Sequence, residues 1–294
     1  MTPSDIWKHV RVDPQALERN PYLHPAPTGG GSGSGAGAGS GAGNPPPPNP
    51  AHGINAGNYL KLENIVCTDA DNKVFESYSE LYLAKDIICN SDKSQINKKP
   101  YDWAVYFEPQ GLFLPSFALS CNLLQALFQG RSNPEIKAIL DQYKDKGNGT
   151  GYHAQNTVVD FGAEQIIHYP TVADFNQTGA VNAGKPRVPQ NFARAALQDS
   201  LLEDALREAE PTRYVKQLTG LRDPSILVEI GTYFGKPAKL WFPWNGKAGT
   251  GFREKRAAWL GCYDANFYLL AGSDLGGSSA ARGVGLVLPR SGAP

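Results

Sequence analysis

The chain lacks the sequence features typical of zinc-ribbon proteins, membrane-spanning proteins and nucleic-acid-binding proteins. Its 294 residues include four cysteines, none spaced as C-x-x-C, so neither a zinc ribbon nor a thioredoxin-like site is expected. No apolar run approaches the ~20 residues of a membrane-spanning helix, and no secretion signal is visible at the N-terminus. Basic and acidic residues balance at 28 each, so bulk charge does not favour a nucleic-acid partner.

The four cysteines, Cys67, Cys89, Cys121 and Cys262, are expected to be buried thiols that pack as small hydrophobic side chains. The alternative is a disulfide between Cys67 and Cys89 in an oxidising compartment. The sequence does not identify the compartment.

The composition divides the chain into three parts. Residues 1–27 form a short arm, in which Asp13 and Pro14 begin one or two helical turns. Residues 28–50 are rich in Gly, Ser, Ala and then Pro, so we expect a disordered linker that stiffens toward its end. Residues 51–294 form the globular part, with its core in 101–294. Two roles are open for the tethered arm: it docks on another molecule, which includes a second copy of this chain, or it is a mobile tail.

The globular part is predicted to be α+β, with two to four helices and a C-terminal antiparallel meander. Apolar spacing predicts helices over 117–129, from Pro134 toward Gly147, and over 200–210. Their expected N-caps are Ser116, Asn133 and Ser200, and Pro211 is expected to end the last helix. Residues 225–234 fit either a helix or a buried strand. The expected strands cover 101–114, 157–161, 165–169, 257–260, 266–270 and 284–288, and the last three make the meander. Asp69, Asp71 and Asn72 are expected to form an Asx-type turn.

Two parts of this pattern resemble C-type-lectin-like domains, a group that includes retroelement variable proteins and relatives of the formylglycine-generating enzyme. The pieces that match near the C-terminus are Trp259, the Phe267–Tyr268 strand and Arg282. An aromatic strand followed by Leu-Pro-Ser and two helices resembles the opening half of the same domains. The resemblance implies a mixed domain whose ligand is held near the C-terminal loops. The sugar-and-calcium triplets and the Arg-Gly-Gly-Ser ending are absent, so calcium-dependent sugar binding and cysteine chemistry do not carry over.

Aromatic residues near the C-terminus give the first candidate site. Large aromatic side chains beside glycine-rich loops are typical of sugar or protein recognition, through stacking and anchoring. The alternative is that most of them belong to the core. The predicted ligand-binding residues are Trp241, Trp244, Tyr263, Asp264, Tyr268 and Arg282.

A second candidate is a polar set that could hold a divalent metal or act as acid and base, and it comprises Tyr152, His153, Asp160, Glu164, His168 and Asp174. His153 and His168, with Asp160, supply suitable ligands, although their spacing matches no known motif. The competing interpretation is that these histidines are hydrogen-bonded within the fold. A Cys121–His153 nucleophile pair is disfavoured because Cys121 falls on the core stripe of its predicted helix.

Three functions therefore follow from the sequence. The first is a non-catalytic recognition or display module that contacts a carbohydrate or a protein and needs no cofactor. The second is a metal-assisted hydrolase centred on His153 and His168. The third is a structural virion or surface-assembly protein whose arm binds its neighbour.

Overall fold

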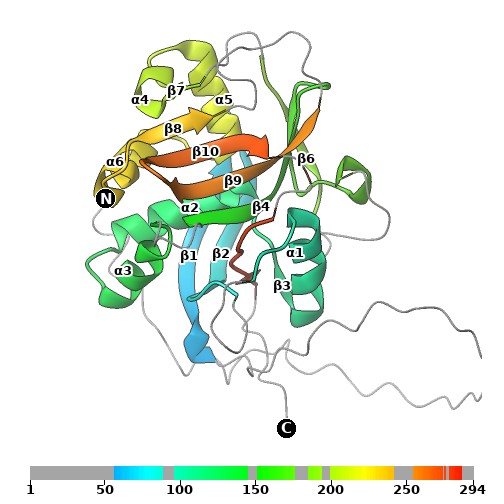
Figure 1. Cartoon of the computed structure of the whole chain (residues 1–294). Coiled ribbons are helices and arrows are strands. Elements are labelled where there is room, and N and C mark those ends of the chain that lie inside the picture. Colours follow the sequence, from blue (N-terminus) through cyan, green and yellow to red (C-terminus); the bar gives the residue numbers. More distant parts are fainter. Residues whose placement is uncertain are drawn as a thin grey trace, which may run out of the picture.

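A computed structural model shows a mixed α+β protein built from two sheets and the helices packed on them (Figure 1). The structure describes residues 56–88, 96–144, 151–175, 185–193, 199–241, 254–273, 275 and 278–286. The predicted arm, the linker and Cys89 lie outside these ranges. Within them, no helix has the length and apolar character needed to cross a membrane.

Helix α2 (Phe117–Gln129) lies at the centre of the fold, and its bounds match the sequence prediction. The Ser116 hydroxyl accepts a hydrogen bond from the Leu119 amide at 3.1 Å, the N-cap that the sequence predicts. All but two of its side chains are buried, because α2 contacts both sheets and three other helices. Cys121 is fully buried on this helix and Cys67 faces it from β1, and neither forms a disulfide. Burial raises the pKa of both thiols, so they are unreactive core residues.

The smaller sheet has the strand order β1-β2-β11-β3. Its strands are β1 (Tyr59–Thr68), β2 (Val74–Ala84), β3 (Leu112–Phe113) and β11 (Val284–Gly285). β1 and β2 form an antiparallel hairpin whose turn is closed by Asp69, which accepts hydrogen bonds from the amides of Asp71 and Lys73. This Asx turn confirms the sequence prediction.

Asn64 changes which side chains of this hairpin face the core. Its φ of 57° lies in the left-handed region, which asparagine tolerates better than most residues. Before it Leu60 and Leu62 are buried; after it the buried positions shift by one, to Ile65 and Cys67. The burial pattern of β2 shifts in the same way. Glu76 and Tyr78 therefore face the same side of the sheet as Leu81 and Leu83, which are buried on that side further along the strand.

The larger sheet has the strand order β6-β5-β4-β9-β10-β8-β7 and mixes antiparallel and parallel pairs. Its strands are β4 (Gly151–Asp160), β5 (Gln165–His168), β6 (Val188–Asn191), β7 (Ser200–Leu201), β8 (Ala238–Trp241), β9 (Lys255–Tyr263) and β10 (Asn266–Ser273). The predicted strands over 157–161, 165–169, 257–260 and 266–270 are thus all present.

The predicted aromatic strand over residues 101–114 is wrong. Residues Pro100–Phe107 form helix α1, followed by the 3₁₀ turn η5 (Glu108–Gln110) and the short strand β3. Pro100 occupies the first helical turn, and its spacing to Trp103, Ala104 and Phe107 puts all four on one buried face. The aromatic content suggested a strand, but the three- and four-residue spacing determined the structure.

The other helices confirm one prediction, decide between the two alternatives left open for residues 225–234, and correct a third prediction. α3 (Pro134–Asp141) begins with the predicted Asn133 cap but ends before Gly147, and residues 225–234 contain helix α6 (Ile226–Phe234). The single helix predicted over 200–210 is instead β7, the turn α4 (Leu202–Ala205) and helix α5 (Ala209–Thr219). Pro211 sits in the first turn of α5, where proline is tolerated, rather than ending a helix.

The C-terminal meander is only partly present. β9 and β10 pair as an antiparallel hairpin, but β11 pairs with β2 and β3 in the smaller sheet. The described residues also contain six α-helices rather than two to four. The α+β class is therefore established, while the three-strand meander is corrected because its last strand joins the sheet that holds the first strands of the fold.

Candidate functional site

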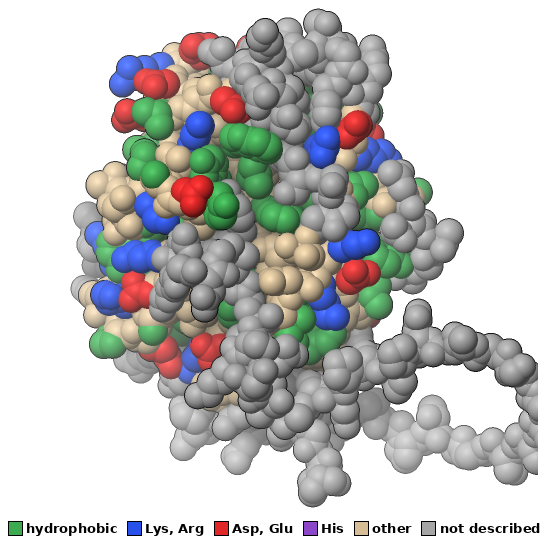
Figure 2. Space-filling view, viewed as in Figure 1, with side chains coloured by type: hydrophobic (Ala, Val, Ile, Leu, Met, Phe, Trp, Pro, Cys, Tyr) green, Lys and Arg blue, Asp and Glu red, His purple; other side chains and the backbone are tan. Residues whose placement is uncertain are grey.

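The outer face of β8, β9 and β10 carries aromatic side chains at alternating positions. Helices α2 and α6 cover the inner face of these strands, where Leu240, Leu260 and Phe267 are buried. The intervening residues point to the other face, which is turned toward the viewer in Figure 1. Trp241, Trp259 and Tyr268 lie there, each only partly buried. Hydrophobic side chains gather over these strands in the space-filling view of Figure 2.

The strand register aligns these residues in rows across the sheet. Trp241 on β8 and Trp259 on β9 are both paired with Leu270 of β10. Because neighbouring strands lie about 4.8 Å apart, the two tryptophan backbones are separated by about 10 Å. In the next row Tyr268 faces Gly261, whose missing side chain leaves room for the tyrosine ring. We name the set Trp241, Trp259, Tyr268 and Tyr263 the aromatic face.

Polar groups border the aromatic face at the β9–β10 turn. Asn266 donates a hydrogen bond from Nδ2 to the Tyr268 hydroxyl at 3.0 Å. Tyr263, 42% exposed, and exposed Asp264 form the start of the turn, where Asp264 has a φ of 46°. Lys239 lies beside Tyr268 on β8. Aromatic planes bordered by amide, carboxylate and ammonium groups can stack on a ligand and hydrogen-bond to its edge.

The sequence-predicted ligand residues divide between this face and other places. The aromatic face and the turn that borders it bring together Trp241, Tyr263, Asp264 and Tyr268. Trp244 lies outside the described residues. Arg282 is 3% exposed and does not join the face.

Arg282 instead ties together three segments. Its guanidinium donates to the Ala84 carbonyl at the end of β2 and, at 2.6 Å, to Oε1 of Gln142 after α3. No carboxylate of the described residues lies within 4.0 Å of it, and burial lowers its pKa. These hydrogen bonds anchor residues 278–283, which lead into β11, so Arg282 has a structural role in place of the predicted ligand contact.

His168, one of the predicted metal ligands, is satisfied by its own fold. Its Nε2 lies 3.0 Å from the Gln217 carbonyl, which only accepts, so Nε2 carries the proton. Nδ1 must then accept from the Thr157 hydroxyl at 3.1 Å, and that hydroxyl also accepts from the Phe117 amide. Burial lowers the pKa of His168 to about 4, which keeps the ring neutral at pH 7. Both nitrogens are thus occupied by protein contacts.

His153 and Asp160 do not join His168. The His153 ring stacks on Tyr143 at 4.2 Å, and burial together with the Arg282 charge lowers its pKa to about 3. The Asp160 carboxylate accepts from the amides of Gly162 and Ala163 in the turn after β4. No group of three or more His, Cys, Asp or Glu residues in the described ranges is placed to hold a metal ion. The predicted metal site is therefore not assembled there.

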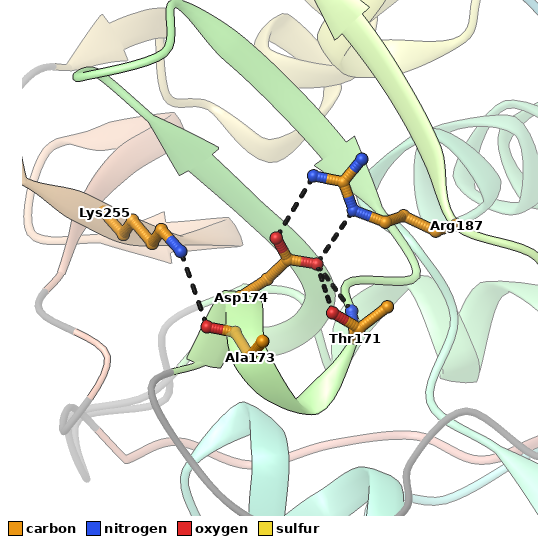
Figure 3. Close-up of polar contacts among 5 residues, drawn as sticks. All are labelled: Thr171, Ala173, Asp174, Arg187 and Lys255. Carbon is orange, nitrogen blue, oxygen red and sulfur yellow. Dashed lines mark hydrogen bonds and ion pairs between the residues drawn. The ribbon is translucent and has the colours of Figure 1, made fainter.

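Asp174, another member of the predicted polar set, is held in an ion pair (Figure 3). Arg187 donates to both carboxylate oxygens at 2.9 and 3.1 Å, and Thr171 donates from its amide and its hydroxyl. Burial raises the pKa of Asp174, but these hydrogen bonds outweigh it and the pKa lies below its usual value. The pair fixes the turn η6 (Val172–Phe175), which Lys255 also contacts through the Ala173 carbonyl.

A cluster that the sequence did not reveal surrounds Lys185. Its ammonium group lies against Tyr78, Phe113 and Tyr169, next to the carboxylate of Glu76. These residues come from four distant segments, so no spacing rule connects them. Phe113 and Tyr169 fall in the predicted strands over 101–114 and 165–169, but no sequence pattern links them to Lys185.

Comparisons with known proteins give no assignment. The chain matches no protein-family model, and neither the curated proteins nor the solved structures contain a match to it. The function of the chain must therefore be inferred from the geometry of the aromatic face and of the groups around it.

Proposed function

We propose that this protein is a non-catalytic recognition module that binds carbohydrate on the aromatic face. The observation that carries the proposal is the alignment of Trp241, Trp259 and Tyr268 on one side of three adjacent strands. Pyranose rings present C–H groups on their faces and hydroxyl groups around their rims. Flat aromatic side chains match the ring faces, and polar groups at the border match the hydroxyls.

The spacing of the face favours an oligosaccharide over a single sugar. Two tryptophans about 10 Å apart can each stack on a separate ring of one chain. Asn266, Asp264 and Lys239 offer a donor, an acceptor and a cation beside these rings. A protein ligand would instead be expected to need a larger apolar contact area, with buried anchors.

The groups considered for catalysis support a binding role. His168 and His153 are neutral and buried, and Asp160 is engaged in a turn. The resemblance to C-type-lectin-like domains stays a prediction. The β9–β10 hairpin supports it, and the separate sheet of β11 speaks against it.

A glycan array probed with the full chain tests the proposal. We expect selective binding to a small set of related oligosaccharides, and the same array probed with Trp241→Ala should lose those signals. Binding that survives in Trp241→Ala would place the ligand elsewhere. An array without any signal, together with a protein partner that Trp241→Ala fails to bind, would replace carbohydrate with protein as the ligand.

A further inference from the structure

The ammonium group of Lys185 is enclosed by aromatic rings. Nζ lies 4.0 Å from the ring centroid of Phe113, 4.4 Å from that of Tyr78 and 5.9 Å from that of Tyr169. It donates a hydrogen bond to the Tyr78 hydroxyl, and no carboxylate of the described residues lies within ion-pair distance. The negative faces of aromatic rings attract a cation at such distances. The rings therefore provide much of the electrostatic surroundings of this charge.

Glu76 provides an acid beside the rings. Its Oε1 accepts from the hydroxyls of Tyr78 and, at 2.6 Å, Tyr169. Its Oε2 is buried and makes no hydrogen bond of normal geometry in the described part of the chain, although the Ser116 side chain also interacts with this carboxylate. A buried carboxylate oxygen that lacks such a bond is costly, so it requires an explanation. One explanation is that Oε2 of Glu76 serves as an acceptor for a bound ligand.

Two residues with unfavourable backbone angles, Tyr169 and Asn64, help to position the rings and the carboxylate. Tyr169 has a φ of 52°, which is unfavourable for a residue with a bulky side chain and typical of functional positions. Glu76 and Tyr78 are two residues apart on β2 and therefore face the same side of the sheet, and the shift at Asn64 determines which side this is. Phe113 contacts both tyrosines, with ring centroids 6.4 Å apart in each pair.

We propose that Tyr78, Phe113, Tyr169 and Glu76 form a binding site for an organic ammonium group, and that Lys185 fills this site from within the chain. Three rings and a carboxylate are the chemistry by which proteins recognise alkylated ammonium ions. Tyr78, Glu76 and Lys185 are each partly exposed, so an external ammonium can reach the site from the side that Lys185 enters.

The Lys185 side chain is suited to being displaced. Holding this long side chain in one conformation costs rotamer entropy, which is regained when the side chain leaves the rings. Burial lowers its pKa, and the nearby Glu76 charge opposes this only in part. A quaternary ammonium ion keeps its charge at any pH and is more weakly hydrated, so it competes well for the same rings.

The test uses tetramethylammonium chloride as the probe and sodium chloride at the same concentration as the reference. Isothermal titration should show at least tenfold tighter binding of tetramethylammonium to Lys185→Ala than to the wild type. Glu76→Gln or Tyr78→Leu, added to Lys185→Ala, should each remove that gain. A folded Lys185→Ala protein that binds no tighter than the wild type would overturn the proposal, and so would affinity that is indifferent to the second change.

A measurement on the unmodified protein covers the case in which Lys185→Ala fails to fold. Limited acetylation with acetic anhydride, read by mass spectrometry at Lys185, reports how often the amine leaves the rings. Tetramethylammonium should raise the acetylation of Lys185 severalfold and leave that of Lys137, which is exposed and paired with Asp141, unchanged. Equal acetylation of Lys185 with and without the probe contradicts displacement.

Discussion

Trp241 and Trp259 lie opposite the same residue, Leu270, on the two strands that flank β10. The relationship joins residues far apart in sequence into one row, on the face of the sheet that α2 and α6 do not cover. It follows from one parallel and one antiparallel pairing to the same central strand. The proposed ligand surface depends on this row and on Tyr268 in the next.

Truncation of this row should weaken ligand binding without loss of fold. For the oligosaccharide selected on the array, Trp241→Ala and Tyr268→Ala should each raise the Kd at least tenfold by titration calorimetry, which corresponds to about 1.4 kcal/mol. Val105→Ala is the matched control, because Val105 is an exposed apolar residue on α1, 42% accessible. Equal affinity in all three variants would remove the aromatic face from the binding site.

Gly220 should be a stability determinant of the central helix. Its φ is 63°, and an added Cβ would lie 2.7 Å from the Ala118 Cβ of α2 and 3.2 Å from the Cys67 Cβ of β1. Gly220→Ala therefore combines left-handed strain with overpacking, and we expect a loss of about 3 kcal/mol in urea unfolding.

Gly235 provides the control for that measurement. Its φ of 72° is similar, but nothing lies within 4 Å of an added Cβ. Gly235→Ala should cost only about 1 kcal/mol. Equal losses in the two variants would mean that the close contact of Gly220 with α2 contributes nothing.

Arg282→Met should destabilise the fold by about 2 kcal/mol. The change removes hydrogen bonds to the Ala84 carbonyl and Gln142, leaving buried acceptors unpaired, while relief of the buried charge offsets part of the loss. Arg213→Met is the comparison, because its ion pair with Asp71 is exposed and should matter little. Unfolding in urea measures the stability loss of each variant. An Arg282→Met protein as stable as the wild type would show that residues 278–283 are held in place by other contacts.

His168 should make the protein less stable in mild acid. Its pKa falls from 6.5 when unfolded to about 4 when folded, so between these values the unfolded chain binds a proton that the folded chain does not. The free energy of unfolding should therefore fall as pH drops through this window, by about 3 kcal/mol in total from this residue.

His168→Phe isolates that contribution. The variant retains a ring beside Phe75 but loses both hydrogen bonds, so it should be less stable at pH 7 by about 2 kcal/mol. It should also lose the share of the slope that comes from His168, while His153 keeps its own share, so that the two stability curves converge as the pH falls and meet at about pH 5. Parallel curves for wild type and variant would show that His168 is not the titrating group.

Elements with local signals could be predicted from the sequence. Ser116 and Asn133 cap α2 and α3 as expected, because a cap and the apolar stripe behind it lie within a few residues of each other. The β9–β10 hairpin was predictable for a similar reason, since two apolar runs separated by a short polar break indicate paired strands. Trp241, Tyr263 and Tyr268 were singled out because they lie near glycine-rich loops, whereas their common side of the sheet follows from the strand pairing.

Features that depend on distant pairing could not be predicted. β11 joins β2 and β3 rather than β10, and nothing in its own residues indicates that choice. Arg282 has the charge of a ligand residue, but only the fold shows that it is buried against Ala84 and Gln142. The rings around Lys185 come from segments of both sheets, so their proximity is a property of the complete fold and not of any one segment.

The most direct test of the recognition proposal is a two-dimensional NMR titration of the tryptophan indole N–H signals with the selected oligosaccharide. The signal of Trp241 should shift in a saturable manner with the same Kd that calorimetry gives, and so should that of Trp259, whose Nε1 is buried but whose ring lies on the aromatic face. The signal of Trp103, which is fully buried and donates to the Ser279 carbonyl at 2.7 Å, should stay in place. Saturable binding that leaves the Trp241 and Trp259 signals unmoved would contradict the account.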